Sequence, residues 1–154
     1  MKIKIKKIND TAITPTRGSE YAAGYDLYAN FNEDLCLIYP HEVLKVPTGV
    51  AMAIPDGNFG AVFARSGAAT RQGLRPANCV GVIDSDYRGE IIVALRNDTD
   101  TIQEVRRGER IAQIVIMPYS SVEFEEADEL DSTARGSGGF GSTDKKYEQL
   151  SMFE

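Results

Sequence analysis

The sequence predicts a single, mostly β domain, because short apolar runs separated by turn residues fill most of its 154 residues. Glycine and proline interrupt these runs at short intervals, and no stretch keeps a sustained helical period. Many short strands at this spacing are typical of a β-sandwich or barrel. The length suits one domain with an adequate core, and we find neither an internal repeat nor a linker between two domains.

The expected elements follow in chain order. The first strand, residues 3–8, alternates lysine with isoleucine at the period of two that defines a strand, and it lacks the apolar region of a signal peptide. One short helix is expected over residues 67–72, entered after Ser66 and ended at Gly73. The remaining expected strands are apolar runs bounded by turn residues, at 25–29, 35–38, 42–47, 50–54, 59–64, 80–83, 91–95, 101–105 and 110–117.

Charge and cysteine content exclude several classes of protein. The net charge of −6 argues against general binding to nucleic acid or to anionic membranes. No apolar stretch approaches the length of a membrane span. Cys36 and Cys79 lack the CxxC spacing of a zinc site or a redox pair. We therefore expect a cytoplasmic protein without nucleic-acid or membrane partners.

The segment richest in chemistry lies near the middle of the chain. Two β-branched runs, residues 80–83 and 91–95, flank a polar stretch, which predicts a β-hairpin with a long tip. In an extended chain Asp84 and Asp86 would share one face. Asp84 directly follows an apolar pair and is expected to lie deeper, where a partly desolvated carboxylate is a better general base. Alternatively, the aspartates only support the turn and Tyr87 packs on its flank.

Two polar features interrupt the apolar strands. Asp26 lies inside an apolar run, where an unpaired carboxylate would be costly, so it needs hydrogen-bond partners or a role in a site unless it faces water on an edge strand. Arg65 and Ser66 precede the expected helix, whose free N–H groups and partial positive charge suit a phosphate. Alternatively, Ser66 only caps that helix.

Gln113 is the polar residue of the apolar run 111–116. A buried amide needs partners for its donors and its acceptor, and either a ligand phosphate or a neighbouring loop could provide them. The alternative is that Gln113 faces solvent, although the flanking residues on both faces are apolar. If both faces are covered, we expect a second chain to cover one of them.

Residues 135–144 form a glycine-rich segment around Phe140. A flexible linker is one interpretation, but a linker has no use for a phenylalanine at the centre of its glycines. Backbone N–H groups freed by glycine can form an anion-binding nest, with Arg135 supplying charge. Phe140 could stack on a base, a contact worth about 1–3 kcal/mol. Together these features predict a mobile lid that orders over a nucleotide.

Taken in their order along the chain, the five segments around Asp26, Arg65, Asp84, Gln113 and Phe140 resemble the five signature motifs of the homotrimeric dUTP pyrophosphatases (dUTPases). Their spacings are also about those of the family. The resemblance covers residues 22–143. It implies a mostly antiparallel, jelly-roll-like β domain of the β-clip type with one short helix, assembled as a homotrimer whose C-terminal lid is exchanged between subunits. It divides the chain into a β domain at 1–134, a lid at 135–144 and an extension at 145–154.

The resemblance also implies a role for each motif residue. Asp84 would activate the water that attacks the α-phosphorus of dUTP, which releases pyrophosphate and leaves dUMP. Tyr87 would pack on the deoxyribose and leave no room for a 2′-hydroxyl, with Asp26 as a supporting residue. One site would draw on three subunits. The other implied contacts are to uracil (Asn78, Val82, Ile83 and Ile92), to the phosphates (Arg65, Ser66, Gly67 and Gln113) and within the lid (Arg135, Phe140, Gly141 and Ser142).

The expected cofactor is Mg²⁺. Asp84 and Asp86 could in principle hold Mg²⁺ between them. The resemblance implies instead that Mg²⁺ is carried on the three phosphates of the substrate and is otherwise coordinated mainly by water, with no direct protein ligand. Neutralising the phosphates in this way fits the electrostatic demand of phosphoryl chemistry.

One departure and three rival functions remain. Ala64 stands where the family commonly has proline, so the entry to the phosphate loop is less rigid. A dCTP deaminase of the same fold attacks the nucleotide base at C4 and needs a glutamate there, whereas this chain has the aspartates and the full lid. A regulatory, protein-binding trimer would resemble phage relatives that carry an insert between the motif of Gln113 and the lid. Here the segment between them, residues 117–134, is short. A purely structural trimer would not need the full set of chemical residues.

The last residues of the extension resemble a different kind of motif. They are similar to the short peptide by which bacterial proteins dock on the replicative sliding clamp, which would bring the enzyme to sites of DNA synthesis. Three apolar anchors and one glutamine supply the expected contacts, and three tails on a trimer would add avidity. Alternatively, the tail packs on its own trimer. The residues of this motif are Gln149, Leu150, Ser151, Met152 and Phe153.

Overall fold

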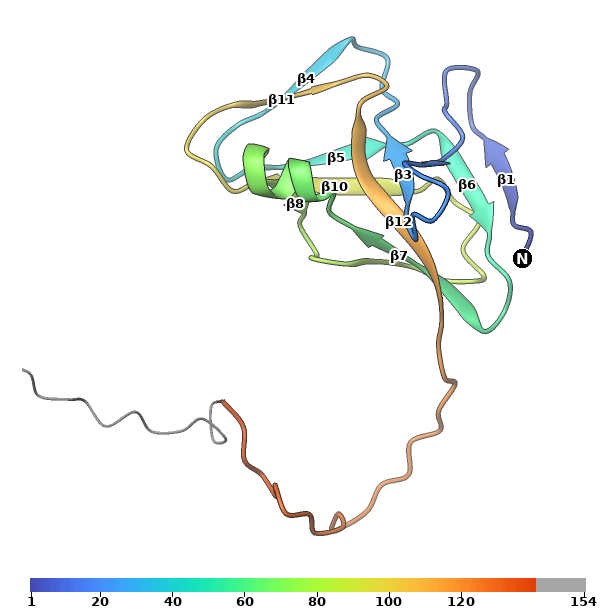
Figure 1. Ribbon diagram of the computed structural model, residues 1–154, viewed down its shortest axis with the longest axis vertical. Coiled ribbons are helices and arrows are strands. Elements are labelled where there is room, and N and C mark those ends of the chain that lie inside the picture. The colour runs from blue at the N-terminus through green and yellow to red at the C-terminus, as the bar shows by residue number, and fades with distance from the viewer. Residues whose placement is uncertain (141–154) are drawn as a thin grey trace, which may run out of the picture. The chain divides into compact units, whose positions relative to one another are not determined.

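The structure is a computed structural model, and it describes residues 1–140 of the chain. Within them the fold contains twelve strands and one short helix (Figure 1), all before Ser121. A second unit begins at Val122. The elements are β1 (Lys4–Lys7), β2 (Thr16–Arg17), β3 (Tyr25–Tyr28), β4 (Leu35–Ile38), β5 (Val43–Pro47), β6 (Val50–Ala53), β7 (Asn58–Phe63), η1 (Ala68–Gln72), β8 (Leu74–Pro76), β9 (Gly81–Ile83), β10 (Ile92–Asn97), β11 (Gln103–Arg106) and β12 (Arg110–Pro118).

The strands pair in antiparallel fashion into four sheets. The largest has five strands in the order β2-β3-β12-β7-β9, and a second has three in the order β5-β10-β8. Two further pairs are β1-β6 and β11-β4. Most neighbours in these sheets come from distant parts of the sequence. Buried residues from all four sheets form one common core (Figure 1). The prediction of a mostly β fold with one short helix is confirmed.

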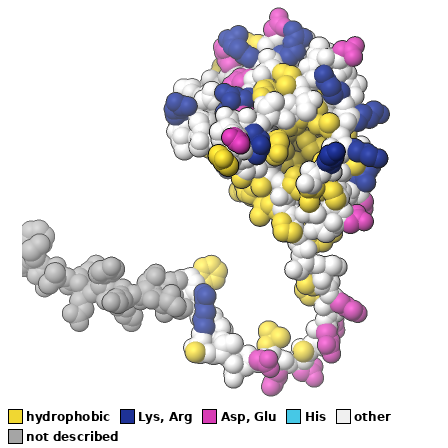
Figure 2. Space-filling model, turned by 45° about the vertical axis from the view of Figure 1, so that its right-hand side comes forward, with side chains coloured by type: hydrophobic (Ala, Val, Ile, Leu, Met, Phe, Trp, Pro, Cys, Tyr) yellow, Lys and Arg dark blue, Asp and Glu magenta, His cyan; other side chains and the backbone are white. Residues whose placement is uncertain are grey.

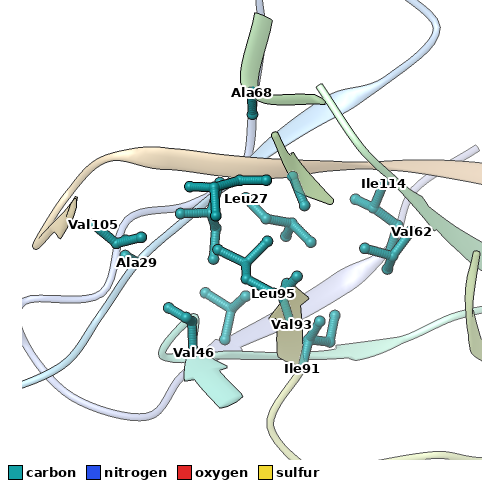
Figure 3. Packing of buried hydrophobic residues seen from close by; sticks show 14 of the residues in the cluster. Leu27, Ala29, Val46, Val62, Ala68, Ile91, Val93, Leu95, Val105 and Ile114 are labelled. Carbon is teal, nitrogen blue, oxygen red and sulfur yellow. The ribbon is translucent and has the colours of Figure 1, made fainter. Parts of the chain in front are cut away.

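The core lies where the inner faces of these sheets meet. Strand β10 shows how the sequence builds it, since its alternate residues Val93, Leu95 and Asn97 are buried while their neighbours are more exposed. Leu27 from β3 lies over Leu95 from the opposite sheet, and Ile114 from β12 lies beside Val62 from β7 (Figure 3). Burial of this kind stabilises the fold by about 25 cal/mol per Å² of apolar surface.

The buried amide of Asn97 has full hydrogen bonding. Its Nδ2 donates to the carbonyl oxygens of Ile38, at 3.0 Å, and Thr101, at 2.7 Å. Its Oδ1 accepts from the backbone N–H and the hydroxyl of Thr99. These bonds hold residues 99–101 in a loop, so the strand expected at 101–105 starts later, at Gln103.

The predicted hairpin around Asp84 is wrong in its pairing. Its two expected arms became β9 and β10, but β9 pairs with β7, whereas β10 pairs with β5 and β8. The arms therefore belong to different sheets, and residues 84–91 form a connection between sheets instead of a hairpin tip. Local sequence predicted the two strands, but the distant partners of each strand decided the pairing.

Two short strands escaped prediction. Strand β2 has only two residues and pairs with β3. Strand β8 contains a proline and pairs with the end of β10. Arg75 of β8 and Arg96 of β10 both bond the carboxylate of Asp98, and the hydrogen bond from Arg75 lowers the pKa of that carboxyl most. Strands of two or three residues have too little pattern to be recognised from sequence.

Residues 122–140, the described part of the second unit, contain neither helix nor strand. Their side chains are largely exposed, with Phe124 at 92% and Leu130 at 90%. Acidic side chains follow one another along the segment (Figure 2). Within the described part of the chain, no helix is long and apolar enough to cross a membrane. The lid residues Gly141 and Ser142 and the extension at 145–154 lie outside the described residues.

Candidate active site

Asp26 is buried and bonds two arginines, one from the segment after β7 and one from β12. Its Oδ1 accepts from Nε of Arg65 at 2.8 Å, and its Oδ2 accepts from Nη1 of Arg110 at 3.3 Å. The expectation that this carboxylate has partners is confirmed. Arg110 was not among the predicted site residues. A buried carboxylate needs charged partners, and this requirement could have pointed to the arginines of both neighbouring segments.

Gln113 lies in the same row of the five-stranded sheet. On β12 it stands opposite Asp26 of β3 and Phe63 of β7. Its Nε2 donates to the carbonyl oxygen of Ala64 at 2.9 Å, so a neighbouring loop supplies one of the partners that the amide needs. A Cβ added to Gly24 would lie 2.5 Å from the amide oxygen, so a side chain at position 24 would displace the amide of Gln113. We call Asp26, Arg65, Arg110 and Gln113 the arginine cluster.

The segment after Arg65 turns directly into the short helix. The backbone N–H of Ala69 donates to the carbonyl oxygen of Arg65, and the helix ends at Gly73 with a left-handed φ of 65°. The predicted helix and its end are thus confirmed. Its N-cap is Gly67, without a side-chain capping bond, so the alternative that Ser66 only caps the helix is wrong. Ser66 is exposed beside the arginine cluster.

A surface pocket of about 400 Å³ opens beside this segment. Three of its lining residues are arginines and one is acidic, so positive charge dominates. We call it the arginine pocket. It is lined by Arg65, Gly67, Ala68, Arg71, Gln72, Glu109 and Arg110.

Asp84 begins the connection between β9 and β10, and it is exposed. The chain leaves the sheet there in a turn, closed by the N–H of Tyr87 donating to the carbonyl oxygen of Asp84 at 3.2 Å. The expectation that Asp84 lies deeper and drier than Asp86 is wrong for the single chain, because both are exposed. The two are also not in an extended stretch, so the period-two argument fails. We call residues 84–91 the Asp84 loop.

The Asp84 loop is held by its own side chains and by a neighbouring turn. The hydroxyl of Tyr87 donates to the carbonyl oxygen of Glu90 at 3.0 Å, and its ring lies against Gly89. The carboxylate of Glu90 accepts from the N–H of Gly49 at 2.7 Å. The hydroxyl of Thr48 donates to the carbonyl oxygen of Ile91 at 2.6 Å. The loop therefore has a defined conformation although its tip is exposed.

The residues predicted to contact uracil surround this loop on its two strands and on the turn before them. Asn78 is exposed in the turn after β8. Val82 of β9 is 59% exposed and Ile92 of β10 is 49% exposed, whereas Ile83 packs against the core. Exposed apolar side chains beside backbone N–H and C=O groups suit the face and edge of a base.

The arginine cluster and the Asp84 loop occupy different levels of the five-stranded sheet. Gln113 pairs with Phe63, while Ile83, the residue before Asp84, pairs with Gly60, which faces Ile116. The register places Ile83 three residues along from Gln113, which corresponds to about 10 Å at ~3.3 Å per residue, and Asp84 follows Ile83 out of the sheet. One chain thus brings together the segments that carry Asp26, Arg65 and Gln113 and holds the Asp84 loop apart from them.

Two groups of predicted residues remain to be placed. In the lid, Nε of Arg135 donates to the carbonyl oxygen of Gly138 at 2.8 Å, and Phe140 is fully exposed with a φ of 48°. These contacts lie within the second unit, so they do not place the lid against the site. Among residues 1–140, no cluster of three or more His, Cys, Asp or Glu side chains could hold a metal ion.

Comparison with known proteins identifies the family. The dUTPase family model matches residues 10–144. The deoxyuridine 5′-triphosphate nucleotidohydrolase of Desulfitobacterium hafniense is 52% identical over 130 residues, which is 84% of this chain and 85% of that protein. The enzyme of the same name from Hydrogenobaculum sp. is 43% identical over 95% of this chain and 100% of its own length. The chain therefore belongs to the dUTPase family.

Solved structures agree with this assignment. The dUTPase of Staphylococcus bacteriophage 80alpha, a G164S mutant with dUpNHpp, superposes with a TM-score of 0.83 at 27% identity. The match covers 92% of this chain and 98% of that one. The jelly-roll-like dUTPase fold that the motifs implied is confirmed.

Proposed function

We propose that this protein hydrolyses dUTP to dUMP and pyrophosphate, which keeps uracil out of DNA and supplies dUMP for dTMP synthesis. The observation that carries the proposal is family membership, with curated relatives named deoxyuridine 5′-triphosphate nucleotidohydrolase at up to 52% identity across most of the chain. Exposed apolar side chains lie beside the Asp84 loop, and positive charge dominates the arginine pocket. The two surfaces suit a nucleotide, which has a base at one end and phosphates at the other.

Pyrophosphate release from dUTP, compared with dTTP, dCTP and UTP, tests the function directly. We expect rapid release from dUTP and little from the other three. Release of ammonia from dCTP would show a deaminase of the same fold instead. Equal rates with dUTP and dTTP would contradict a site that reads uracil.

In the proposed mechanism Asp84 accepts a proton from the water that attacks the α-phosphorus in line. A general base must lie within hydrogen-bond reach of that water, and the turn that starts at Asp84 leaves its carboxylate accessible. Uracil is read by the side chain of Asn78 and by the backbone of Val82, Ile83 and Ile92. The phosphates are bound by Arg65, Ser66, Gly67 and Gln113, and the lid residues Arg135, Phe140, Gly141 and Ser142 close over them.

A homotrimer would complete this site. The register of the five-stranded sheet separates Asp84 from the arginine cluster, which favours a site made from the Asp84 loop of one copy and the arginine cluster of another. The exposed side chains of Val82 and Ile92 would gain cover in such an assembly. Within it we keep the division into a β domain at 1–134, a lid at 135–144 and an extension at 145–154.

Magnesium fits this site only as a companion of the substrate. As the resemblance to the family implies, Mg²⁺ would be held by the phosphates of the substrate and by water, with no direct protein ligand. When bound there, it neutralises phosphate charge. We place the enzyme in the cytoplasm, where its substrate is made, and we assign no nucleic-acid or membrane partner.

Tyr87 sets the preference for deoxyribose in this proposal. Replacing Tyr87 by alanine opens space beside C2′, so the ratio of kcat/KM for dUTP to that for UTP should fall by about ten-fold or more. Tyr87→Phe keeps the ring and loses only the hydrogen bond to Glu90, so it should retain most of the discrimination. Steady-state kinetics with both nucleotides measure the ratio, and an unchanged ratio in Tyr87→Ala would remove the residue from this role.

The residues from Gln149 to Phe153 support a second proposal, which is docking on a bacterial sliding clamp. A labelled peptide of residues 145–154 and the whole protein would be titrated with clamp by fluorescence anisotropy. We expect weak binding by the peptide, because ordering a free chain costs entropy, and tighter binding by the trimer. Binding that survives the double replacement Leu150→Ala and Phe153→Ala, or no binding at all, would sink the idea.

A further inference from the structure

Arg71 is the arginine of the arginine pocket to which no role has yet been given. Its guanidinium lies directly over Gly67, since a Cβ added to Gly67 would be 2.8 Å from Nη2 of Arg71. We propose that Arg71 is an additional substrate-binding residue that contacts the two terminal phosphates of the nucleotide. The proposal rests on the function proposed above and adds a contact to it.

The conformation of Gly67 is the first support. Its φ of −65° and ψ of −39° lie in the right-handed helical region, which every residue adopts. Glycine at such a position is less favourable than alanine by roughly 0.5–1 kcal/mol. The backbone therefore does not need glycine there, in contrast to Gly73, whose φ is 65°. The missing side chain of Gly67 instead leaves the space that the guanidinium of Arg71 occupies.

The distribution of charge is the second support. Arg65 and Arg110 share the carboxylate of Asp26, whereas Arg71 forms no salt bridge within residues 1–140. The acidic residue of the pocket, Glu109, already accepts from the backbone N–H of Arg106 at 2.9 Å. Arg71 is exposed, so its charge is available to a ligand that enters the pocket.

The spacing on the helix adds the geometry. The helix is one short turn of π type, and within it the guanidinium of Arg71 folds back over Gly67. A guanidinium presents a planar fork of donors that matches two phosphate oxygens at once. Since Asp84 works at the α-phosphorus, the pocket lined by arginines suits the other end of the triphosphate, which leaves as pyrophosphate.

Calorimetry on the full-length protein separates this role from a general effect on the site. The ligands are inorganic pyrophosphate, the imido analogue of dUTP and dUMP, each with Mg²⁺ present. In Arg71→Gln we expect the affinities for pyrophosphate and for the analogue to fall by about ten-fold or more, as for loss of a hydrogen bond to a charged group. Affinity for dUMP, which lacks the terminal phosphates, should change by less than about two-fold.

Two further variants complete the experiment. Arg71→Lys keeps the charge but loses the fork, so it should recover part of the pyrophosphate affinity. Arg107→Gln is the matched control, because it removes an exposed guanidinium that is paired with Asp34 and does not line the arginine pocket, and it should leave all three affinities unchanged.

Unchanged pyrophosphate affinity in Arg71→Gln would overturn the proposal. So would an equal loss of affinity for dUMP, because that result would show general damage to the site. The function is tested separately on the wild-type protein. If it released no pyrophosphate from dUTP and yet bound pyrophosphate through Arg71, the function would fail while the phosphate-binding role stood.

Discussion

Replacing Asp84 by asparagine should lower the turnover of dUTP by about 10²–10⁴-fold, because the group that takes a proton from the attacking water is lost. The amide has nearly the same shape as the carboxylate, and position 84 is exposed in a turn held by backbone and by neighbouring side chains. We therefore expect the thermal stability of the variant and its affinity for the imido analogue of dUTP to stay close to those of the wild type. Steady-state kinetics and calorimetry measure both quantities.

Asp86 provides a matched control for this experiment. It lies two residues further along the same loop and is equally exposed, so Asp86→Asn removes the same charge from nearly the same place. Its turnover should stay within a few-fold of the wild type, as is usual for an exposed substitution. Near-normal turnover in Asp84→Asn, or an equal fall in both variants, would show that the water is activated elsewhere or that only the charge of the loop matters.

The sequence predicted the strands well because each one carries a local pattern. Strand β4 begins and ends where it was expected, β3, β6 and β12 differ from expectation by one residue at one end, and β7 is shifted by one residue at both ends. Asp26 and Gln113 were also found from sequence, because a polar group inside an apolar run must have partners. Their partners were distant in sequence, so only the fold could identify Arg110 and the carbonyl of Ala64.

The pairing of strands and the burial of the loop were harder, since both depend on contacts between distant residues. Local sequence favoured pairing β9 with β10, but β9 pairs with β7 and β10 pairs with β5 and β8, in two different sheets. Asp84 follows the apolar, partly buried Ile83, but the chain leaves the sheet directly after Ile83, so Asp84 is exposed. In the proposed assembly, cover for Asp84 would come from another copy, which no local pattern describes.

Ending the chain after Ala134 should leave a folded protein whose kcat/KM for dUTP is lower by about 100-fold or more, because the proposed stacking of Phe140 on uracil and the proposed phosphate contact of Arg135 would both be lost. Among residues 1–140, the last side chain that packs in or against the core is Ile116, so the unfolding temperature should be nearly unchanged. Ending the chain after Asp144 is the control, since it removes only the extension and should keep full activity. Phe140→Ala in the full-length chain isolates the stacking contact and should raise KM by about ten-fold. Full activity without residues 135–154 would show that the site closes without this segment.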